Sequence, residues 1–177
     1  MNTWVTSDLH LGHKNIIKYS NRPFSTVEEM KTHIISEWNK NVQPNDTVYI
    51  LGDVAFCSAS EAARMLNTMH GTKILIEGNH DVKLVKDVSF RKCFNSIHKY
   101  LEIKYNSYFL CLFHYQIIEW NRGHHGSFHL FGHKHGTGIK PNNRSMDIGM
   151  DATGKVVSKL DDIIELLLPN VIIKHNN

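Results

Sequence analysis

Short apolar and β-branched runs recur along the chain, and polar residues or glycine bound each of them. Runs of this kind between turn signals are typical of buried strands. The pattern predicts strands at residues 3–6, 47–51, 73–76, 108–113, 128–131 and 145–148.

Three longer stretches carry apolar residues at helical spacing. Residues 25–41 and residues 58–69 each begin with a serine or threonine that is suited to an N-cap, and acidic side chains follow in the first turn. Residues 160–168 form a third stretch, which ends at Pro169. We therefore expect three helices between and after the predicted strands.

The order of these elements changes along the chain. Strands and helices alternate through the first eighty residues, which predicts βαβ units and a partly parallel sheet. After residue 95 the strands follow one another closely, and residues 105–107 are typical of a hairpin turn between strands at 101–104 and 108–113. The sequence thus predicts mixed sheets with helices outside them.

Length and composition narrow the class of protein. A chain of 177 residues with 41% apolar and 21% charged residues is typical of one compact domain, here residues 1–177 with no separate cap domain. The formal net charge of +3 provides no strongly basic surface, so we expect no stable complex with nucleic acid. No apolar run approaches 18 residues, so no membrane span is expected.

The cysteines and the amino-terminal residues bear on location. Three cysteines at wide spacing, without a Cys-x-x-Cys pair, indicate neither a disulfide framework nor a thiolate zinc site. The first residues do not have the pattern of an export signal. We expect a cytoplasmic protein, and the sequence leaves its oligomeric state open.

Thirteen histidines stand out, and many lie beside Asp, Asn and Gly directly after predicted strands. Ligands of open α/β sheets bind outside the carboxyl ends of the strands, so we expect these residues to meet in one place. The residues concerned are Asp8, His10, Asp53, Asn79, His80, Asp81, His114, His133 and His135.

Each of these motifs taken alone has an ordinary structural explanation. Asp-x-His and Gly-Asp are common turns, Gly-Asn-His-Asp can form an Asx-turn, and Gly-His-x-His can be an exposed loop. Five strand ends in succession carry metal-ligand side chains, however, and independent turns explain that less well than one shared site.

The order Asp-x-His, Gly-Asp, Gly-Asn-His-Asp, a later His and Gly-His-x-His resembles the calcineurin-like metallophosphoesterase superfamily. The motifs cover residues 3–136, and the tail from residue 146 is similar to the closing strands of small bacterial and phage members. The resemblance implies an α/β fold, a four-layer α/β/β/α sandwich of two mixed sheets flanked by helices. One departure is that Gly52-Asp53 continues as Val-Ala-Phe, where the family often has a further acidic residue and Arg.

The resemblance also implies a binuclear metal centre. One ion would be held by Asp8, His10, Asp53 and His135, and the other by Asp53, Asn79, His114 and His133. Oxygen and imidazole ligands without thiolate suit two divalent ions, with Mn²⁺ favoured and Fe, Zn, Co or Ni as further candidates. A hydroxide bridging the two ions would attack the phosphorus in line.

By the same resemblance, His80 protonates the leaving oxygen. Asp81 is expected either to orient His80 or to cap a helix at residues 82–86. Arg22, His13 and His124 are the candidate substrate contacts. The tryptophans and phenylalanines are expected in the core rather than as platforms for stacking bases.

These features together predict a phosphodiesterase acting on a phosphoester or nucleotide, such as a cyclic or short nucleotide. The open alternatives are a phosphomonoesterase, a mononuclear zinc hydrolase, and a non-catalytic module that binds metal, RNA or protein. The complete ligand set and His80 favour an enzyme over the non-catalytic module.

Overall fold

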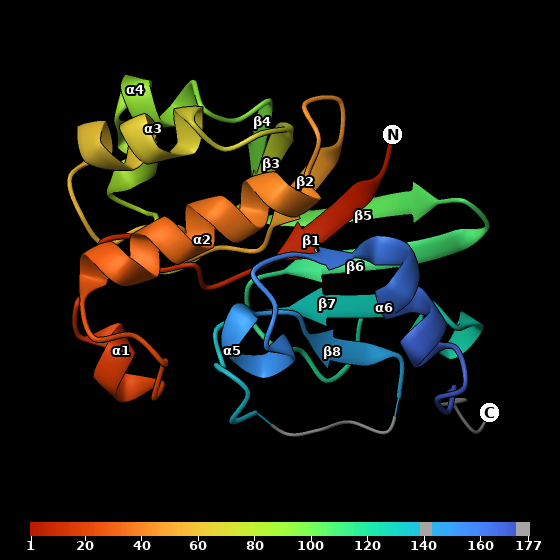
Figure 1. Cartoon of the computed structure of the whole chain (residues 1–177). Coiled ribbons are helices and arrows are strands. Elements are labelled where there is room, and N and C mark those ends of the chain that lie inside the picture. Colours follow the sequence, from red (N-terminus) through yellow and green to blue (C-terminus); the bar gives the residue numbers. More distant parts are fainter. Residues whose placement is uncertain (139–142, 173–177) are drawn as a thin grey trace.

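Two β-sheets form the centre of the fold in a computed structural model, which describes residues 1–138 and 143–172 (Figure 1). The first sheet has the order β4-β3-β2-β1-β9, with the first four strands parallel and β9 antiparallel to β1. Its strands are β1 (Thr3–Thr6), β2 (Thr47–Ile50), β3 (Thr72–Ile76), β4 (Ser96–His98) and β9 (Ser158–Lys159).

The second sheet has the order β5-β6-β7-β8. Its strands are β5 (Tyr100–Tyr105), β6 (Tyr108–Phe113), β7 (Phe128–Phe131) and β8 (Ser145–Asp147). β5 and β6 form the expected antiparallel hairpin, and Asn106 takes a positive φ of 53° in its turn. β6, β7 and β8 run parallel, so both sheets are mixed as predicted.

The predicted long helices are confirmed. In α2 the hydroxyl of Thr26 accepts a hydrogen bond from the Glu29 backbone N–H, and in α3 the hydroxyl of Ser58 accepts one from the Glu61 N–H. The helices are α1 (Ile16–Tyr19), α2 (Val27–Asn41), α3 (Ala59–Asn67), α4 (Val88–Arg91), α5 (Met150–Thr153) and α6 (Leu160–Leu167), with 3₁₀ turns η1 (Leu84–Lys86) and η2 (Gly123–His125).

The apolar side chains form two clusters, one on each side of the first sheet. α2, α3 and α4 bury one cluster against its outer face, with Trp38 and Phe90 fully buried. The other cluster joins Val5 of β1 to Leu112 of β6 and Ile163 of α6, so it fills the space between the sheets. The arrangement of two mixed sheets flanked by helices is confirmed.

The outer face of the second sheet is covered by the loop that joins β6 to β7. Cys111 and His129 are paired across β6 and β7, and their strand neighbours Leu112 and Leu130 belong to the cluster between the sheets, so Cys111 and His129 point to the outer face. The Trp120 ring packs on His129 at a centroid distance of 5.4 Å, and the backbone N–H of Ile117 donates to His129 Nε2. Among the described residues no helix combines the length and apolar character needed to cross a membrane.

Asp46 fixes the starts of β1 and β2. Its carboxylate accepts hydrogen bonds from the backbone N–H groups of Asn2 (2.6 Å) and Gln43 (3.1 Å) and from the Trp4 indole (2.9 Å). Burial opposes ionisation, but these donors outweigh it and lower the pKa of Asp46 to about 2. The charged carboxylate therefore stabilises the folded state.

Candidate metal centre

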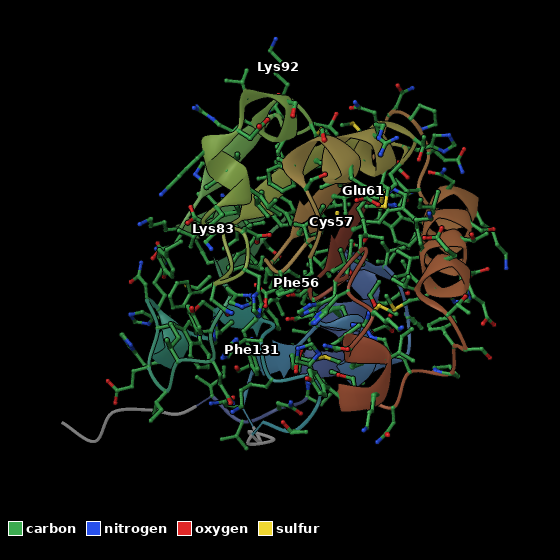
Figure 2. All side chains as sticks on the ribbon, turned by 90° about the vertical axis from the view of Figure 1, so that its left-hand side faces the viewer. Phe56, Cys57, Glu61, Lys83, Lys92 and Phe131 are labelled. Carbon is green, nitrogen blue, oxygen red and sulfur yellow. The ribbon has the colours of Figure 1, made fainter. Side chains whose placement is uncertain are left out.

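The loops after five strands meet at one edge of the two sheets, the edge that faces the viewer in Figure 2. Two groups of side chains form there: Asp8 with His10 and His135, and Asp53 with His114 and His133. Within each group, one potential ligand atom from each residue lies within 4.8 Å of the others. The convergence expected from the strand ends is therefore present.

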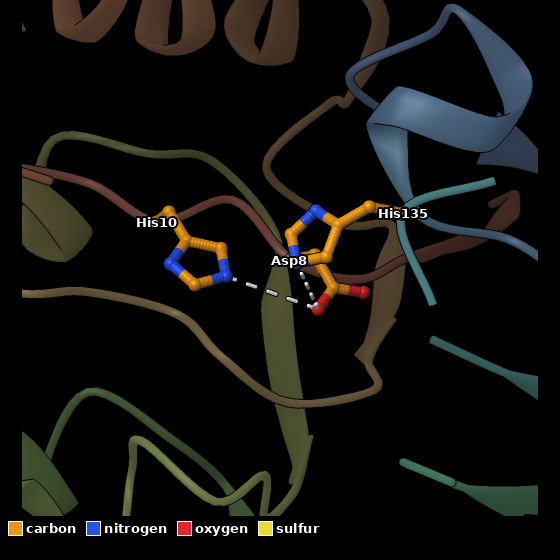
Figure 3. Close-up of side chains that lie close together, drawn as sticks. All are labelled: Asp8, His10 and His135. Carbon is orange, nitrogen blue, oxygen red and sulfur yellow. Dashed lines mark ion pairs between the residues drawn. The ribbon is translucent and has the colours of Figure 1, made fainter. Parts of the chain in front are cut away.

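The first group surrounds Asp8 (Figure 3). Asp8 Oδ1 lies 3.9 Å from His10 Nε2 and 3.7 Å from His135 Nε2. Asp8 Oδ1 and His10 Nε2 are buried and have no hydrogen-bond partner. Buried polar atoms are nearly always satisfied, so this pair fits a cation between them.

Asp53 faces both groups. Its Oδ2 lies 3.6 Å from His10 Nε2, and its Oδ1 lies 3.5 Å from His114 Nε2. His114 Nδ1 is 2.7 Å from the Leu51 carbonyl, to which it donates, so the Nε2 of a neutral His114 presents a lone pair to Asp53. Asn79 Oδ1 also lies 3.0 Å from His114 Nε2. A cation between these facing acceptors would satisfy them, which is the arrangement expected of a bridging carboxylate.

Burial sets the charge of the first group. It raises the pKa of Asp8 to about 7, with His135 acting in the opposite direction, and it lowers the pKa of His10 to about 2. His10 is therefore neutral, as a metal ligand must be, and its contact with Asp8 is not an ion pair. A divalent cation would supply the positive charge that a buried, ionised Asp8 lacks.

The backbone at the site is held in an uncommon conformation. Positive φ is rare for residues other than glycine, and it is retained where the surroundings impose it. Five of the candidate ligands adopt it: Asp8 (57°), His10 (50°), Asp53 (53°), His133 (69°) and His135 (46°). Backbone hydrogen bonds join the loop after β1 to the loop after β2. The Asp8 N–H donates to the Gly52 carbonyl, and the His10 N–H donates to the Asp53 carbonyl. The loops therefore aim the ligands before any ion binds.

Two motif glycines are needed because other groups approach them closely. A Cβ on Gly78 would lie 2.4 Å from Asp53 Oδ1, and one on Gly132 would lie 2.0 Å from Ser7 Oγ and 2.4 Å from Asp8 Oδ2. Beside Gly132, the His133 N–H donates to Asp8 Oδ2 at 2.9 Å. These glycines allow the loops to pack against the carboxylates.

Asp81 neither orients the His80 ring nor caps a helix, in contrast to both expectations. Its carboxylate accepts hydrogen bonds from the backbone N–H groups of Gly78 (2.9 Å), Asp53 (2.8 Å) and Val54 (3.0 Å). The side chain is buried, and burial raises its pKa to about 6 against the effect of these donors. Asp81 thus joins the loop after β3 to the loop after β2 and holds the backbone of Asp53.

Arg22 was expected at the substrate, but its guanidinium is buried and fully engaged. It forms two 2.8 Å bonds to the Asp151 carboxylate, and it donates to the carbonyl oxygens of Leu9 (2.9 Å) and Asp8 (2.6 Å). Its remaining N–H faces Met30 Sδ at 3.5 Å. Arg22 therefore supports the Asp8 loop and has no donor left for a substrate.

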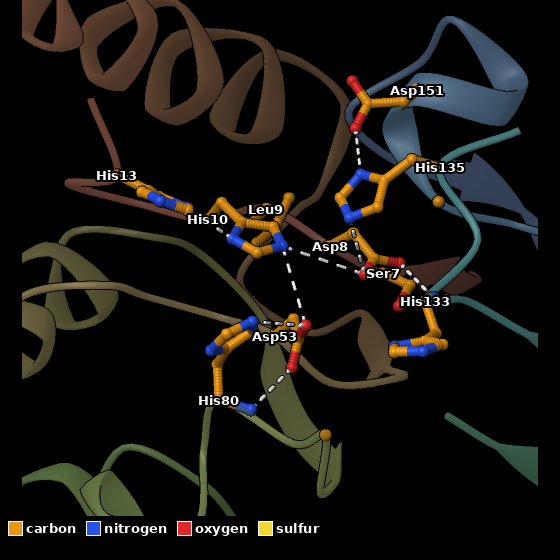
Figure 4. Close-up of polar contacts among 12 residues, drawn as sticks. Ser7, Asp8, Leu9, His10, His13, Asp53, His80, His133, His135 and Asp151 are labelled. Carbon is orange, nitrogen blue, oxygen red and sulfur yellow. Dashed lines mark hydrogen bonds and ion pairs between the residues drawn. The ribbon is translucent and has the colours of Figure 1, made fainter. Parts of the chain in front are cut away.

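Asp151 is a supporting position that the sequence analysis did not single out. His135 Nδ1 lies 2.6 Å from Asp151 Oδ2, so it donates there and leaves Nε2 facing Asp8 (Figure 4). Burial opposes ionisation of Asp151, but His135 and Arg22 hold its pKa below the ordinary value. In the sequence, the only indication of this role was that Asp151 lies in the carboxy-terminal segment that resembles small family members.

The remaining candidate site residues are His80, His13 and His124, and each lies in different surroundings. The His80 side chain is 38% exposed, with Nε2 3.8 Å from Asp53 Oδ2. His13 lies at the rim, where its Nδ1 is 3.0 Å from His10 Nδ1. His124 belongs to η2, which precedes the amino end of β7, whereas His133 follows its carboxyl end. His124 is therefore at the opposite edge of the sheet and is not placed to contact a substrate held at the strand ends.

Comparisons with known proteins identify the family of this chain. The family model for calcineurin-like phosphoesterases matches residues 1–166. The chain is 32% identical to the uncharacterised protein MJ1445 of Methanocaldococcus jannaschii over 98% of this chain and 96% of that protein, and 29% identical to the gene 66 protein of Mycobacterium phage L5 over 94% of each. The solved structure of AQ665 from Aquifex aeolicus, a protein of unknown function, has the same fold, with a TM-score of 0.70 at 22% identity over 94% of this chain and 99% of that one. The chain belongs to the calcineurin-like phosphoesterase family.

Proposed function

We propose that this chain is a phosphodiesterase that depends on two divalent metal ions, with Mn²⁺ the favoured metal. The observation that carries the proposal is Asp53, whose two carboxylate oxygens face the two histidine groups. When bound, a pair of such ions holds phosphoryl oxygens and lowers the pKa of a bound water toward about 7. Asp8, His10 and His135 would hold one ion, and Asn79, His114 and His133 the other, with Asp53 shared.

His80 is the proposed general acid. Its imidazole is partly exposed at the site, and Asp53 lies near its Nε2. Its backbone N–H donates to Asp53 Oδ1 at 3.0 Å, which fixes the backbone of His80 relative to the centre. A positioned imidazolium that protonates the leaving oxygen contributes about 10²- to 10⁴-fold in rate. His80→Ala should therefore slow esters with poor leaving groups far more than nitrophenyl esters, and equal losses on both would contradict this role.

The charges at the centre favour a diester over a monoester. Two divalent ions would bring four positive charges, of which the carboxylates of Asp8 and Asp53 neutralise two. One hydroxide and a singly charged diester would balance the remaining two. A monoester carries a second negative charge. Arg22 cannot take up that charge, because all its donors bind protein atoms.

The test is a comparison of bis(4-nitrophenyl) phosphate with 4-nitrophenyl phosphate on the Mn²⁺-loaded protein. We expect a higher kcat/KM for the diester, and activity that is lost with EDTA and restored by Mn²⁺. Asp53→Asn should abolish turnover of both substrates. Faster turnover of the monoester would make the chain a phosphomonoesterase, and metal-loaded protein that turns over neither substrate would contradict the proposal.

A further inference from the structure

A groove lies beside the candidate metal centre, at the same edge of the sheets. Its volume is about 670 Å³, within the range of small-molecule sites, and Asn79 and His80 form part of its wall. The remaining wall comes from the segment after Asp53 and the segment after Asp81, and it includes Phe56, Val82, Lys83 and Leu84. A leaving oxygen that takes a proton from His80 would therefore lie beside this groove.

Phe56 is the main aromatic surface of the groove. Its side chain is 49% exposed, so the expectation that the phenylalanines belong to the core is wrong at this position. Figure 2 shows Phe56 with Cys57 and Lys83 on the face where the strands end. A single exposed apolar side chain is common, but exposed apolar surface gathered in a groove is typical of a ligand-binding site, and Phe56 shares this groove with Val82 and Leu84.

The Phe56 ring is held in a defined orientation. One face stacks on His13, with centroids 4.1 Å apart and planes at 17°, and His80 packs against it edge-on at 5.2 Å and 72°. The Phe56 backbone N–H donates to the Leu11 carbonyl at 2.8 Å, which ties its loop to the loop after β1. The ring is thus a fixed plane with one face already covered by His13.

The charge of the groove limits its ligand. Among its lining residues Lys83 and the proposed acid His80 can carry positive charge, and none is a carboxylate. Val82 adds apolar surface and is 45% exposed. A flat, neutral ring attached to a phosphate fits these walls, because the ring covers the apolar surface and the phosphate faces the centre.

We propose that the groove binds the base of a nucleoside, which is the leaving group of the diester, by stacking on Phe56. This proposal rests on the proposed function, since it places the nucleoside oxygen beside His80. Stacking of a base on an aromatic side chain contributes roughly 10- to 100-fold to affinity. His13 would then be a positioning residue for Phe56.

The test is to measure affinities of the Mn²⁺-loaded protein for AMP, ribose 5-phosphate, phenyl phosphate and inorganic phosphate by calorimetry. AMP and ribose 5-phosphate share the sugar phosphate and differ by the base. We expect AMP to bind roughly 10- to 100-fold more tightly than ribose 5-phosphate. Phe56→Leu should bring this ratio close to one by weakening the binding of AMP, and Phe56→Trp should retain it.

Phe109→Leu is the matched control, because Phe109 is 37% exposed but lies on β6, where Arg122 covers its ring. It should leave the ratio unchanged. A ratio near one in the wild type, or the same ratio in Phe56→Leu, would overturn the proposal, and so would phenyl phosphate binding as tightly as AMP. Failure of the Mn²⁺-loaded protein to turn over bis(4-nitrophenyl) phosphate would instead overturn the proposed function, so the two failures are distinguishable.

Discussion

Gly132→Ala tests how tightly the loops are packed around the first group of ligands. The new Cβ would lie 2.0 Å from Ser7 Oγ and 2.4 Å from Asp8 Oδ2, whereas real Cβ contacts essentially never fall below 3.0 Å. Relief of the overlap therefore requires shifts of at least 1.0 Å and 0.6 Å at these two atoms. Ser7 cannot move freely, since it is buried and its hydroxyl donates to the Leu51 carbonyl at 2.6 Å.

The shift at Asp8 is about three times the tolerance of roughly 0.2 Å for metal–ligand distances. We expect Gly132→Ala to lose at least about tenfold in Mn²⁺ affinity at the first group. Overpacking should also lower the free energy of unfolding by about 1 to 3 kcal/mol. φ at Gly132 is outside the left-handed region, so alanine is conformationally allowed and the effect reports the contact alone.

The assay is a calorimetric titration of metal-free protein with Mn²⁺, together with unfolding in urea. Gly123→Ala is the control, because its Cβ would meet no atom closer than 3.4 Å, at Trp120. It should bind Mn²⁺ like the wild type. If Gly132→Ala also binds two Mn²⁺ ions with wild-type affinity, the proposed role of the packed Asp8 carboxylate is refuted.

Three further predictions concern single side chains. Asp151→Asn removes the carboxylate behind His135 and should weaken Mn²⁺ binding about 10- to 100-fold, measured by the same titration; unchanged affinity would contradict its role. Asn79→Asp adds a negative charge to the centre and should weaken inhibition by phosphate, and inhibition at least as strong as in the wild type would count against the charge argument. Asp46 has a pKa of about 2 in the folded state and 3.8 in the unfolded state. Its contribution to the free energy of unfolding is therefore complete above pH 3.8 and is lost as the pH falls toward 2. Asp46→Asn should lower stability at pH 7 by about 1 to 3 kcal/mol and flatten its decline between pH 4 and 2 in metal-free protein, and an unchanged pH profile would argue against this.

The strands and the convergence of the ligands could be predicted because their signals are local. Each buried strand is a continuous apolar run, and each candidate ligand follows a predicted strand within a few residues. Parallel strands bring their carboxyl ends to one edge, so adjacency in sequence becomes adjacency in space. Asp8 and His133 were predicted on this basis.

The supporting residues could not be predicted because their contacts are distant in sequence. Arg22 and Asp151 are 129 positions apart, and nothing local distinguishes a buried guanidinium from one at the surface beside a proline. Asp81 follows His80 directly, but its carboxylate turns to backbone N–H groups 27 and 28 positions earlier. The position of His124, by contrast, could be predicted, because residue 124 precedes the predicted strand at 128–131 and so lies at its amino end, away from His133 at the carboxyl end.

The central claim is that one carboxylate, Asp53, is shared by two cations. The most direct test is electron paramagnetic resonance of the protein loaded with two equivalents of Mn²⁺, with the metal content measured on the same sample. We predict two ions per chain and the spectrum of a spin-coupled pair, because ions that share a ligand lie about 3.5 to 4 Å apart. One ion per chain, or two ions with uncoupled spectra, would contradict the claim.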